Sequence, residues 1–254
     1  MNQNNQNLSI LGYTAGRHPH RPFGSKQPDR LFHQYLIGQT GTGKSTLLFS
    51  LTQQDITSDR GFCLIDPHGD LAEQVRAIGS EETQYWDVAD VACPYGYNPI
   101  THVSAPYRPL VASGLIETLK KQWSDAWGAR MEHLLRFALL ALLERPGSTL
   151  QDIMPLFLHS AFRKQVVAEM VDQEVQRFWR HEFPRMNYKT AADGVAPIAN
   201  KLGAFLAHPV VRKALCEPEQ PLRFRQLMDE GKVLIVNLAK GRLGADVSNI
   251  LGGL

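Results

Sequence analysis

Three short apolar runs stand out along the chain, each followed at once by a polar residue or a glycine. They are Tyr35-Leu36-Ile37, Phe62-Cys63-Leu64-Ile65 and Val233-Leu234-Ile235-Val236. Unbroken apolar runs of this length are typical of parallel strands that are buried on both faces. The pattern therefore predicts strands at Tyr35–Ile37, Gly61–Asp66 and Lys232–Asn237, and a weaker strand at Tyr85–Val91.

Apolar residues recur at helical spacing between the second and third runs. This period predicts helices at Leu110–Lys121 and Ser124–Glu144, with a stop at Pro146-Gly147. Ser148-Thr149-Leu150-Gln151 matches a capping box for a further helix. Helical segments are expected to continue to about Leu215.

A chain of 254 residues is long enough for one large α/β domain or for a core with an insertion. We predict an α/β fold whose parallel-sheet core comprises residues 31–104 and 222–254. An all-α domain at residues 105–221 interrupts this core. Residues 1–30 are rich in Gly, Pro, His and Arg towards their end, which favours an extended N-terminal arm.

A glycine-rich loop lies between the first predicted strand and residues 45–51, which are predicted to form the first turns of a helix. Residues 38–45 fit the pattern G-x-x-x-x-G-K-[ST]. Its glycines would let the backbone turn N–H groups onto phosphate oxygens, Lys44 would reach the β- and γ-phosphates, and the Ser45 hydroxyl would ligate Mg²⁺. The candidate cofactors are therefore ATP and Mg²⁺. The predicted cofactor-binding residues are Gly38, Gln39, Thr40, Gly41, Thr42, Gly43, Lys44, Ser45 and Thr46.

Asp66 ends the second predicted strand and is followed by Pro67-His68-Gly69-Asp70. Strands of an open α/β sheet end towards the ligand crevice, which puts Asp66 near the candidate site. No Glu follows it to position a water molecule. We therefore expect Asp66 to shape the rim of the site, or to end the strand and cap the next helix, with Asp70 as N-cap of a helix at Leu71–Ile78.

Overall charge and cysteine content exclude several simple classes. The net charge is only +2, although residues 31–104 hold nine acids against three basic residues. The three cysteines are scattered, which fits neither a metal site nor a disulfide framework and suits a cytoplasmic protein. The longest apolar run, Phe137–Leu143, is far too short to span a bilayer, so any contact with the inner face of a membrane would pass through partners.

Candidate nucleic-acid contacts are less specific. Basic residues of the N-terminal arm could touch phosphates or could simply be solvated. Phe178-Trp179-Arg180 could stack on bases, but aromatic residues at this helical spacing more often belong to a core. Lys240 and Arg242 follow a predicted strand end, and we expect them to contact DNA or a neighbouring subunit.

The order of these motifs resembles the HerA/FtsK superfamily of DNA-pumping P-loop ATPases, and is most similar to the TraG/TraD-like coupling proteins of conjugation and type IV secretion. The resemblance covers nearly the whole chain. It rests on Phe23-Gly24, Asp29-Arg30 and His33, residues 38–46, residues 66–70, Tyr97-Asn98-Pro99, residues 127–132, Asn200-Lys201 and residues 236–244.

The resemblance implies a RecA-like core with an inserted all-α domain, assembled as a hexameric ring around DNA and driven by ATP and Mg²⁺. Secretion-channel or relaxosome proteins are the further partners that it implies. In this family the Mg²⁺-binding Walker B acid and the water-activating Glu follow the strand that Lys232–Asn237 resembles. They are expected beyond Leu254, so the chain is interpreted as an N-terminal fragment that binds nucleotide and hydrolyses it poorly, and its catalytic residues are unknown.

Two other functions remain open at this point. The chain could be a P-loop NTPase that does not bind nucleic acid, or a nucleotide-binding module that recruits partners without acting as a motor. The long helical insertion and the Asn-Leu-x-Lys-Gly loop favour the DNA-translocating ATPase. A steep fall of DNA affinity with salt would separate it from the first of these.

Overall fold

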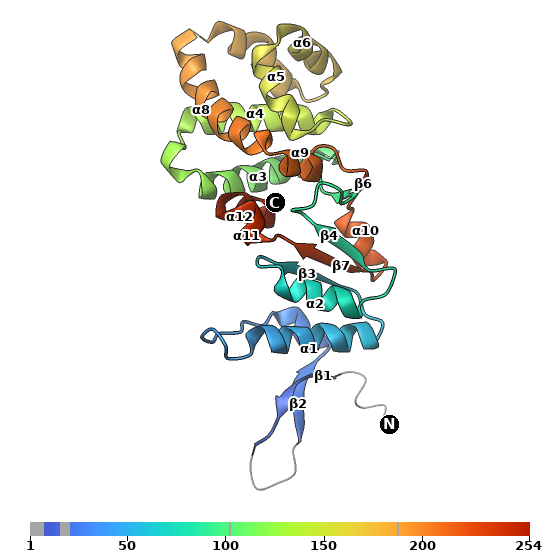
Figure 1. Cartoon of the computed structure of the whole chain (residues 1–254). Helices are drawn as coiled ribbons and strands as arrows, with labels where there is room; N and C mark the ends of the chain where they lie inside the picture. Colours follow the sequence, from blue (N-terminus) through green and yellow to red (C-terminus); the bar gives the residue numbers. More distant parts are fainter. Residues whose placement is uncertain (1–7, 16–20, 102, 187) are drawn as a thin grey trace. The chain divides into compact units, whose positions relative to one another are not determined.

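The computed structural model describes residues 8–15, 21–101, 103–186 and 188–254, without the side chains of residues 188–192. The chain forms two compact units (Figure 1). The first comprises residues 1–85 and 223–237, and the second comprises residues 86–222 and 238–254. The domain division expected from the sequence, with a core at residues 31–104 and 222–254 and an all-α domain at residues 105–221, stays a prediction.

A parallel pair of strands is the centre of the first unit. Strand β3 (Phe62–Asp66) pairs with β7 (Val233–Asn237) from Phe62 opposite Val233 to Asp66 opposite Asn237. The sheet order is β3-β7-β4, and β4 (Gln84–Asp87) begins in this unit. The mixed α/β class with a parallel sheet is thus confirmed.

Helix α2 (Asp70–Ile78) packs on one face of this sheet, and α1 (Lys44–Thr57) packs against α2. Leu71, Ala72 and Val75 of α2 form a core cluster with Ile235, and Phe49, Ile56, Phe62 and Leu64 are among the residues packed against it. Figure 1 shows the two helices on one side of β3 and β7. This packing holds α1, and hence the loop before it, against the sheet.

Strand β3 is only partly buried, although both predicted core strands were expected to be buried. The side chains of Cys63 and Ile65 are exposed, Ile65 by 51%. In the described residues β3 lies at the sheet edge, and the opposite face is not covered at Ile65. By contrast, β7 lies between two strands and is buried from Leu234 to Asn237, as predicted.

The region expected as an extended arm contains a β-hairpin. Strands β1 (Leu8–Tyr13) and β2 (Pro22–Lys26) pair antiparallel, and the short 3₁₀ helix η2 (Pro28–Phe32) follows. The Gln54 side chain of α1 binds both the backbone N–H (2.7 Å) and the carbonyl oxygen (3.0 Å) of Ile10. The hairpin is therefore tied to the helix that follows the glycine loop.

The second unit is mostly helical. Its long helices are α3 (Arg108–Gln122), α4 (Ala129–Glu144) and α8 (Tyr188–Ala207), and its shorter ones are α5 (Ile153–Leu158), α6 (Ser160–Glu169), α7 (Gln173–Arg177), α9 (Pro209–Leu215), α11 (Lys240–Leu243) and α12 (Ala245–Gly253). Helix α4 is its centre, because α3, α5, α6, α7 and α8 all contact it. Eight α4 side chains are buried, in agreement with its apolar sequence.

Two predicted helix starts are shifted along the chain. Helix α4 begins at Ala129 rather than Ser124, because residues 124–126 form a separate 3₁₀ turn and Trp127 is extended. The capping box is built on Thr149 rather than Ser148: the Thr149 hydroxyl accepts from the Gln151 N–H, and the Asp152 carboxylate accepts from the Thr149 N–H. Asp can close such a box as well as the Gln that the pattern expects.

Candidate phosphate-binding site

The glycine loop has the backbone that its sequence requires. Gly41 has φ 84° and Gly43 has φ 90°, a left-handed region that favours glycine. A Cβ at either position would meet nothing within 4 Å, so the backbone conformation and not crowding demands glycine there. The left-handed backbone at these two glycines therefore sets the direction of the N–H groups of the loop.

The Lys44 side chain folds back over the glycine loop that precedes it in the sequence. Its ammonium group donates to the carbonyl oxygens of Gly38 (2.7 Å) and Gln39 (2.8 Å). The Thr42 hydroxyl also donates to the Gln39 carbonyl, at 2.8 Å. The Lys44 charge is thus held over the loop, where a phosphate could take the place of the two carbonyl oxygens.

The start of α1 is open towards this loop. Gly43 is its N-cap, and no side chain caps the first turn. The first N–H groups of a helix have no partner within the helix and carry a partial positive charge, so they attract anions. The Ser45 and Thr46 side chains are exposed at this end. A single hydroxyl from Ser45 suits Mg²⁺, which keeps several waters and shares the oxygens of a bound phosphate.

The strand predicted ahead of the loop is absent, and this prediction was wrong. Residues 33–39 have no regular structure, and the side chains of Tyr35 and Ile37 are 88% and 82% exposed. No described strand pairs with Tyr35–Ile37. A single strand without a hydrogen-bonded neighbour cannot satisfy its backbone groups, so apolar composition alone does not form one.

Asp66 caps the next helix from the end of β3. It is 7% exposed, and its two carboxylate oxygens accept from the N–H groups of His68 and Ala72, both at 3.0 Å. The expected N-cap Asp70 is instead the first residue of α2, and Gly69 with φ 101° takes the N-cap position. Asp66 can cap α2 because β3 ends at Asp66, close enough to the first turn of α2 for its carboxylate to reach the Ala72 N–H group.

A second polar residue at the strand ends was missed by sequence analysis. Asn237 ends β7 opposite Asp66, is 2% exposed and donates from its side chain to the Tyr85 hydroxyl at 2.8 Å. Its amide lies so close to Gly69 that a Cβ there would be 2.7 Å from the Asn237 Oδ1. The available signal was an Asn that ends an otherwise apolar run.

Other sequence candidates belong to other elements of the chain. Lys240 and Arg242 belong to α11 in the second unit, and the Arg242 guanidinium donates to the Asp87 carboxylate (2.9 Å) and the Ala89 carbonyl (3.2 Å). Phe178 and Trp179 are buried, as their helical spacing favoured. Of the basic residues of the arm, Arg30 pairs with Asp55, Arg21 and Lys26 are exposed, and Arg17, His18 and His20 lie outside the described residues.

Within the described part of the chain, no three His, Cys, Asp or Glu side chains gather as a metal site would require. No helix described here combines the length and the apolar character needed to cross a bilayer.

Comparisons with known proteins give only distant likenesses, all to solved structures. No family model matches, and no curated protein matches. A solved structure of the bacterial conjugative coupling protein TrwBdeltaN70, in its unbound monoclinic form, matches with 14% identity and a TM-score of 0.48. The match covers 84% of this chain and 48% of that one, so the chain spans about half the length of this neighbour. A likeness this distant leaves function to be argued from the chain's own residues.

Proposed function

We propose that the first unit binds ATP with Mg²⁺ at residues 38–46, as the phosphate-binding half of a P-loop ATPase. The observation that carries this proposal is a loop with two left-handed glycines, directly before an uncapped helix, with the Lys44 ammonium held across it. Backbone N–H groups, a helix N-terminus and a lysine are the parts that bind phosphate in such loops.

Each residue of the site has a defined part in this proposal. The N–H groups at Gly41–Ser45 surround the β-phosphate, and Lys44 exchanges its two carbonyl acceptors for phosphate oxygens. The bound Mg²⁺ would bridge phosphate oxygens and neutralise their charge, with Ser45 as its protein ligand. Asp66 stays at the rim, because both of its oxygens already accept backbone hydrogen bonds.

Titration calorimetry with ATP and Mg²⁺ tests this assignment. The Lys44→Ala variant should bind at least about tenfold more weakly than the wild-type chain, since a charge-assisted contact is lost. Arg225→Ala is the matched control, because Arg225 is 86% exposed and forms its ion pair with Asp229 on its own helix. Equal affinities in the Lys44→Ala variant and the control would refute the assignment.

We further propose that this ATPase serves as a ring-forming DNA translocase of the conjugative coupling kind. The order of motifs along the chain, and the helical second unit between two parts of the nucleotide-binding unit, support it. Single- or double-stranded DNA and further copies of the chain are the proposed partners, at the cytoplasmic side of a membrane. Because Asp66 is engaged in capping, we expect this chain to hydrolyse ATP slowly even with DNA present.

A nucleotide-binding module without motor activity is the second candidate. It is favoured because both carboxylate oxygens of Asp66 accept backbone hydrogen bonds, so Asp66 is not placed to orient a water molecule. DNA-stimulated turnover separates the two: robust hydrolysis would exclude the module, whereas ATP binding without turnover at any DNA concentration would favour it.

A further inference from the structure

A cavity lies at the end of the sheet where β3 and β7 begin. Helix α10 (Phe224–Asp229) packs beside these strand starts and leaves a space of about 380 Å³. All of its lining belongs to the first unit. The lining residues are Gly61, Phe62, Cys63, Phe224, Leu227, Met228, Gly231, Lys232 and Leu234.

The walls of this cavity are apolar and its floor is backbone. Two aromatic and three aliphatic or thioether side chains line it, of which Leu227 and Leu234 are buried. At the floor the backbones of Gly61 and Gly231 approach so closely that a Cβ on Gly61 would lie 2.3 Å from the Gly231 carbonyl carbon. Binding sites for small molecules are commonly apolar clefts of roughly 300 Å³ or more with few polar groups.

Lys232 is the one charged residue of the lining, and its partner is easily replaced. Its ammonium lies 2.6 Å from a carboxylate oxygen of Glu82, whose side chain is 75% exposed. Exposed ion pairs of this kind contribute little to stability. A carboxylate that entered the cavity could take the place of Glu82 at little cost.

This cavity is distant from the phosphate-binding loop. Helix α1 has 14 residues and therefore runs about 20 Å from Lys44 to Thr57. The chain then reaches Gly61 after three residues, at the start of β3. The glycine loop precedes the N-terminus of α1, and the cavity lies near its C-terminus. A ligand in the cavity therefore need not touch a nucleotide bound at the loop.

We propose that this cavity binds a flat apolar molecule with one carboxylate group. The ring of the molecule lies among Phe224, Leu227 and Met228, and the carboxylate pairs with Lys232 in place of Glu82. The site is separate from the proposed nucleotide site and does not depend on it.

Cys63 provides a reporter inside the cavity. It is exposed, whereas Cys93 is buried and Cys216 is half-buried, so a thiol reagent should reach Cys63 first. The apolar surroundings raise the pKa of the Cys63 thiol, so its alkylation is measured at a fixed, mildly alkaline pH. A ligand in the cavity covers this thiol and slows its alkylation.

The experiment follows alkylation of Cys63 by mass spectrometry during titration with 2-naphthoate. A molecule of this size is expected to bind with a Kd of about 1 mM. Lys232→Gln should weaken protection by naphthoate about tenfold. Glu82→Gln should strengthen it, since Lys232 then loses its hydrogen-bonded carboxylate and keeps only the weaker influence of Glu230 and Asp59. Arg225→Gln is the control, because Arg225 lies on helix α10 but outside the cavity lining, and it should leave protection unchanged.

Met228→Gln tests the apolar wall without disturbing the core, because Met228 is 75% exposed. It should weaken naphthoate protection, while saturating ATP should leave protection unchanged. The proposal is overturned if naphthoate fails to protect Cys63, or if it protects Cys216 equally. Unaltered protection in the Lys232→Gln variant would overturn it as well. None of these outcomes depends on whether residues 38–46 bind ATP.

Discussion

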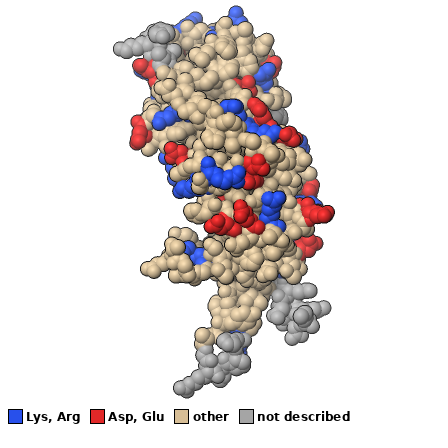
Figure 2. Space-filling model, viewed as in Figure 1, with Lys and Arg blue, Asp and Glu red and all other residues tan. Residues whose placement is uncertain are grey.

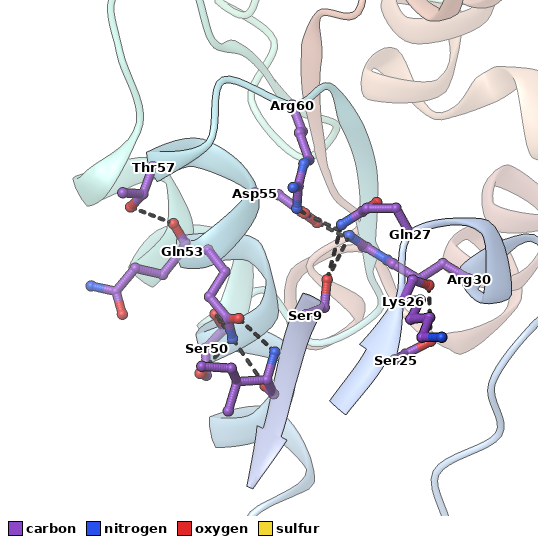
Figure 3. A network of polar contacts seen from close by, with 12 residues as sticks. Ser9, Ser25, Lys26, Gln27, Arg30, Ser50, Gln53, Asp55, Thr57 and Arg60 are labelled. Atoms are coloured by element: carbon purple, nitrogen blue, oxygen red, sulfur yellow. Dashed lines mark hydrogen bonds and ion pairs between the residues drawn. The ribbon is translucent and has the colours of Figure 1, made fainter. Parts of the chain in front are cut away.

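At the scale of single residues, Asp55 is the charge that ties the N-terminal hairpin to α1. Its side chain is 3% exposed and makes two hydrogen bonds to the Arg30 guanidinium, at 2.6 and 2.7 Å. Arg30 also donates to the Ser9 hydroxyl, which Gln27 contacts as well (Figure 3). Asp55 raises the pKa of Arg30 mainly through these hydrogen bonds, so Arg30 stays charged.

Removal of Arg30 should destabilise the first unit. Arg30→Ala leaves the buried Asp55 with only Arg60, at 3.8 Å, and the loss of one partner of a buried pair costs about 3 kcal/mol. Urea unfolding measures the change. In the control Arg225→Ala, which breaks an exposed pair, the loss should be no more than about 0.5 kcal/mol. A loss for Arg30→Ala as small as that of the control would show that the pair does not hold the hairpin.

Glu132 should make stability depend on pH in the acid range. The Trp127 indole N–H lowers its pKa most, followed by Lys120, and Arg136 contributes less. A carboxylate with a lowered pKa stabilises the fold fully above its ordinary value of 4.5 and loses this contribution as the pH falls through the lower, folded-state value. The stability difference between wild type and Glu132→Gln should therefore shrink on acidification. A difference that grew on acidification would contradict this account.

At the scale of elements, the π-helical turn η6 (Phe178–Glu182) brings an aromatic cluster into the core of the second unit. Phe178 stacks on Phe137 with ring centroids 4.0 Å apart, and Trp179 packs against Phe157 and Phe183. The Trp179 indole N–H donates to the Phe137 carbonyl at 3.2 Å. These rings are occupied with each other and are not arranged to stack on bases.

Trp179→Ala should cost about 3–5 kcal/mol of unfolding free energy, because it leaves a large cavity in the core of the second unit. Denaturant unfolding gives this value. In the same protein, titration with single-stranded DNA should show unchanged affinity for the folded fraction. A selective loss of DNA affinity with little loss of stability would contradict this account and indicate that Trp179 stacks on bases.

Elements with a strong local pattern could be predicted from the sequence, and those that depend on distant partners could not. The runs before Asp66 and Asn237 form the expected parallel strands, and the glycine loop is followed by the expected helix. Tyr35–Ile37 has the same composition but no described neighbour, so it forms no strand. The hairpin depends on Gln54 and Asp55, some 25 to 44 residues away, which no local pattern reveals.

The same limit applies to the candidate site. The loop residues could be predicted because phosphate binding needs glycine and lysine at fixed spacing. Asp66 was expected to shape the rim or to cap the next helix, and its carboxylate accepts hydrogen bonds from His68 and Ala72 just after it in the chain. The position of Asn237 against Gly69 and Tyr85 depends on strand register, which the sequence alone does not give.

At the scale of the whole molecule, basic and acidic side chains are interspersed rather than grouped by sign. The net charge is +2, and on the face drawn in Figure 2 basic and acidic side chains lie among each other. An affinity for DNA should therefore involve few phosphate contacts. The slope of log K against log salt should be about −2 to −4, if two to four phosphates are neutralised, which is still a clear fall of affinity with salt. Filter binding at several salt concentrations measures it, and an affinity independent of salt would contradict binding to the DNA backbone.

The most direct test of the central claim is hydrogen exchange of the backbone N–H groups of residues 38–46, with and without ATP and Mg²⁺. The account predicts that nucleotide slows exchange at Gly41–Ser45, and that Lys44→Ala largely abolishes the effect while Arg225→Ala leaves it intact. Protection confined to other parts of the chain, or protection at the loop that is unchanged in the Lys44→Ala variant, would contradict a phosphate-binding role for this loop.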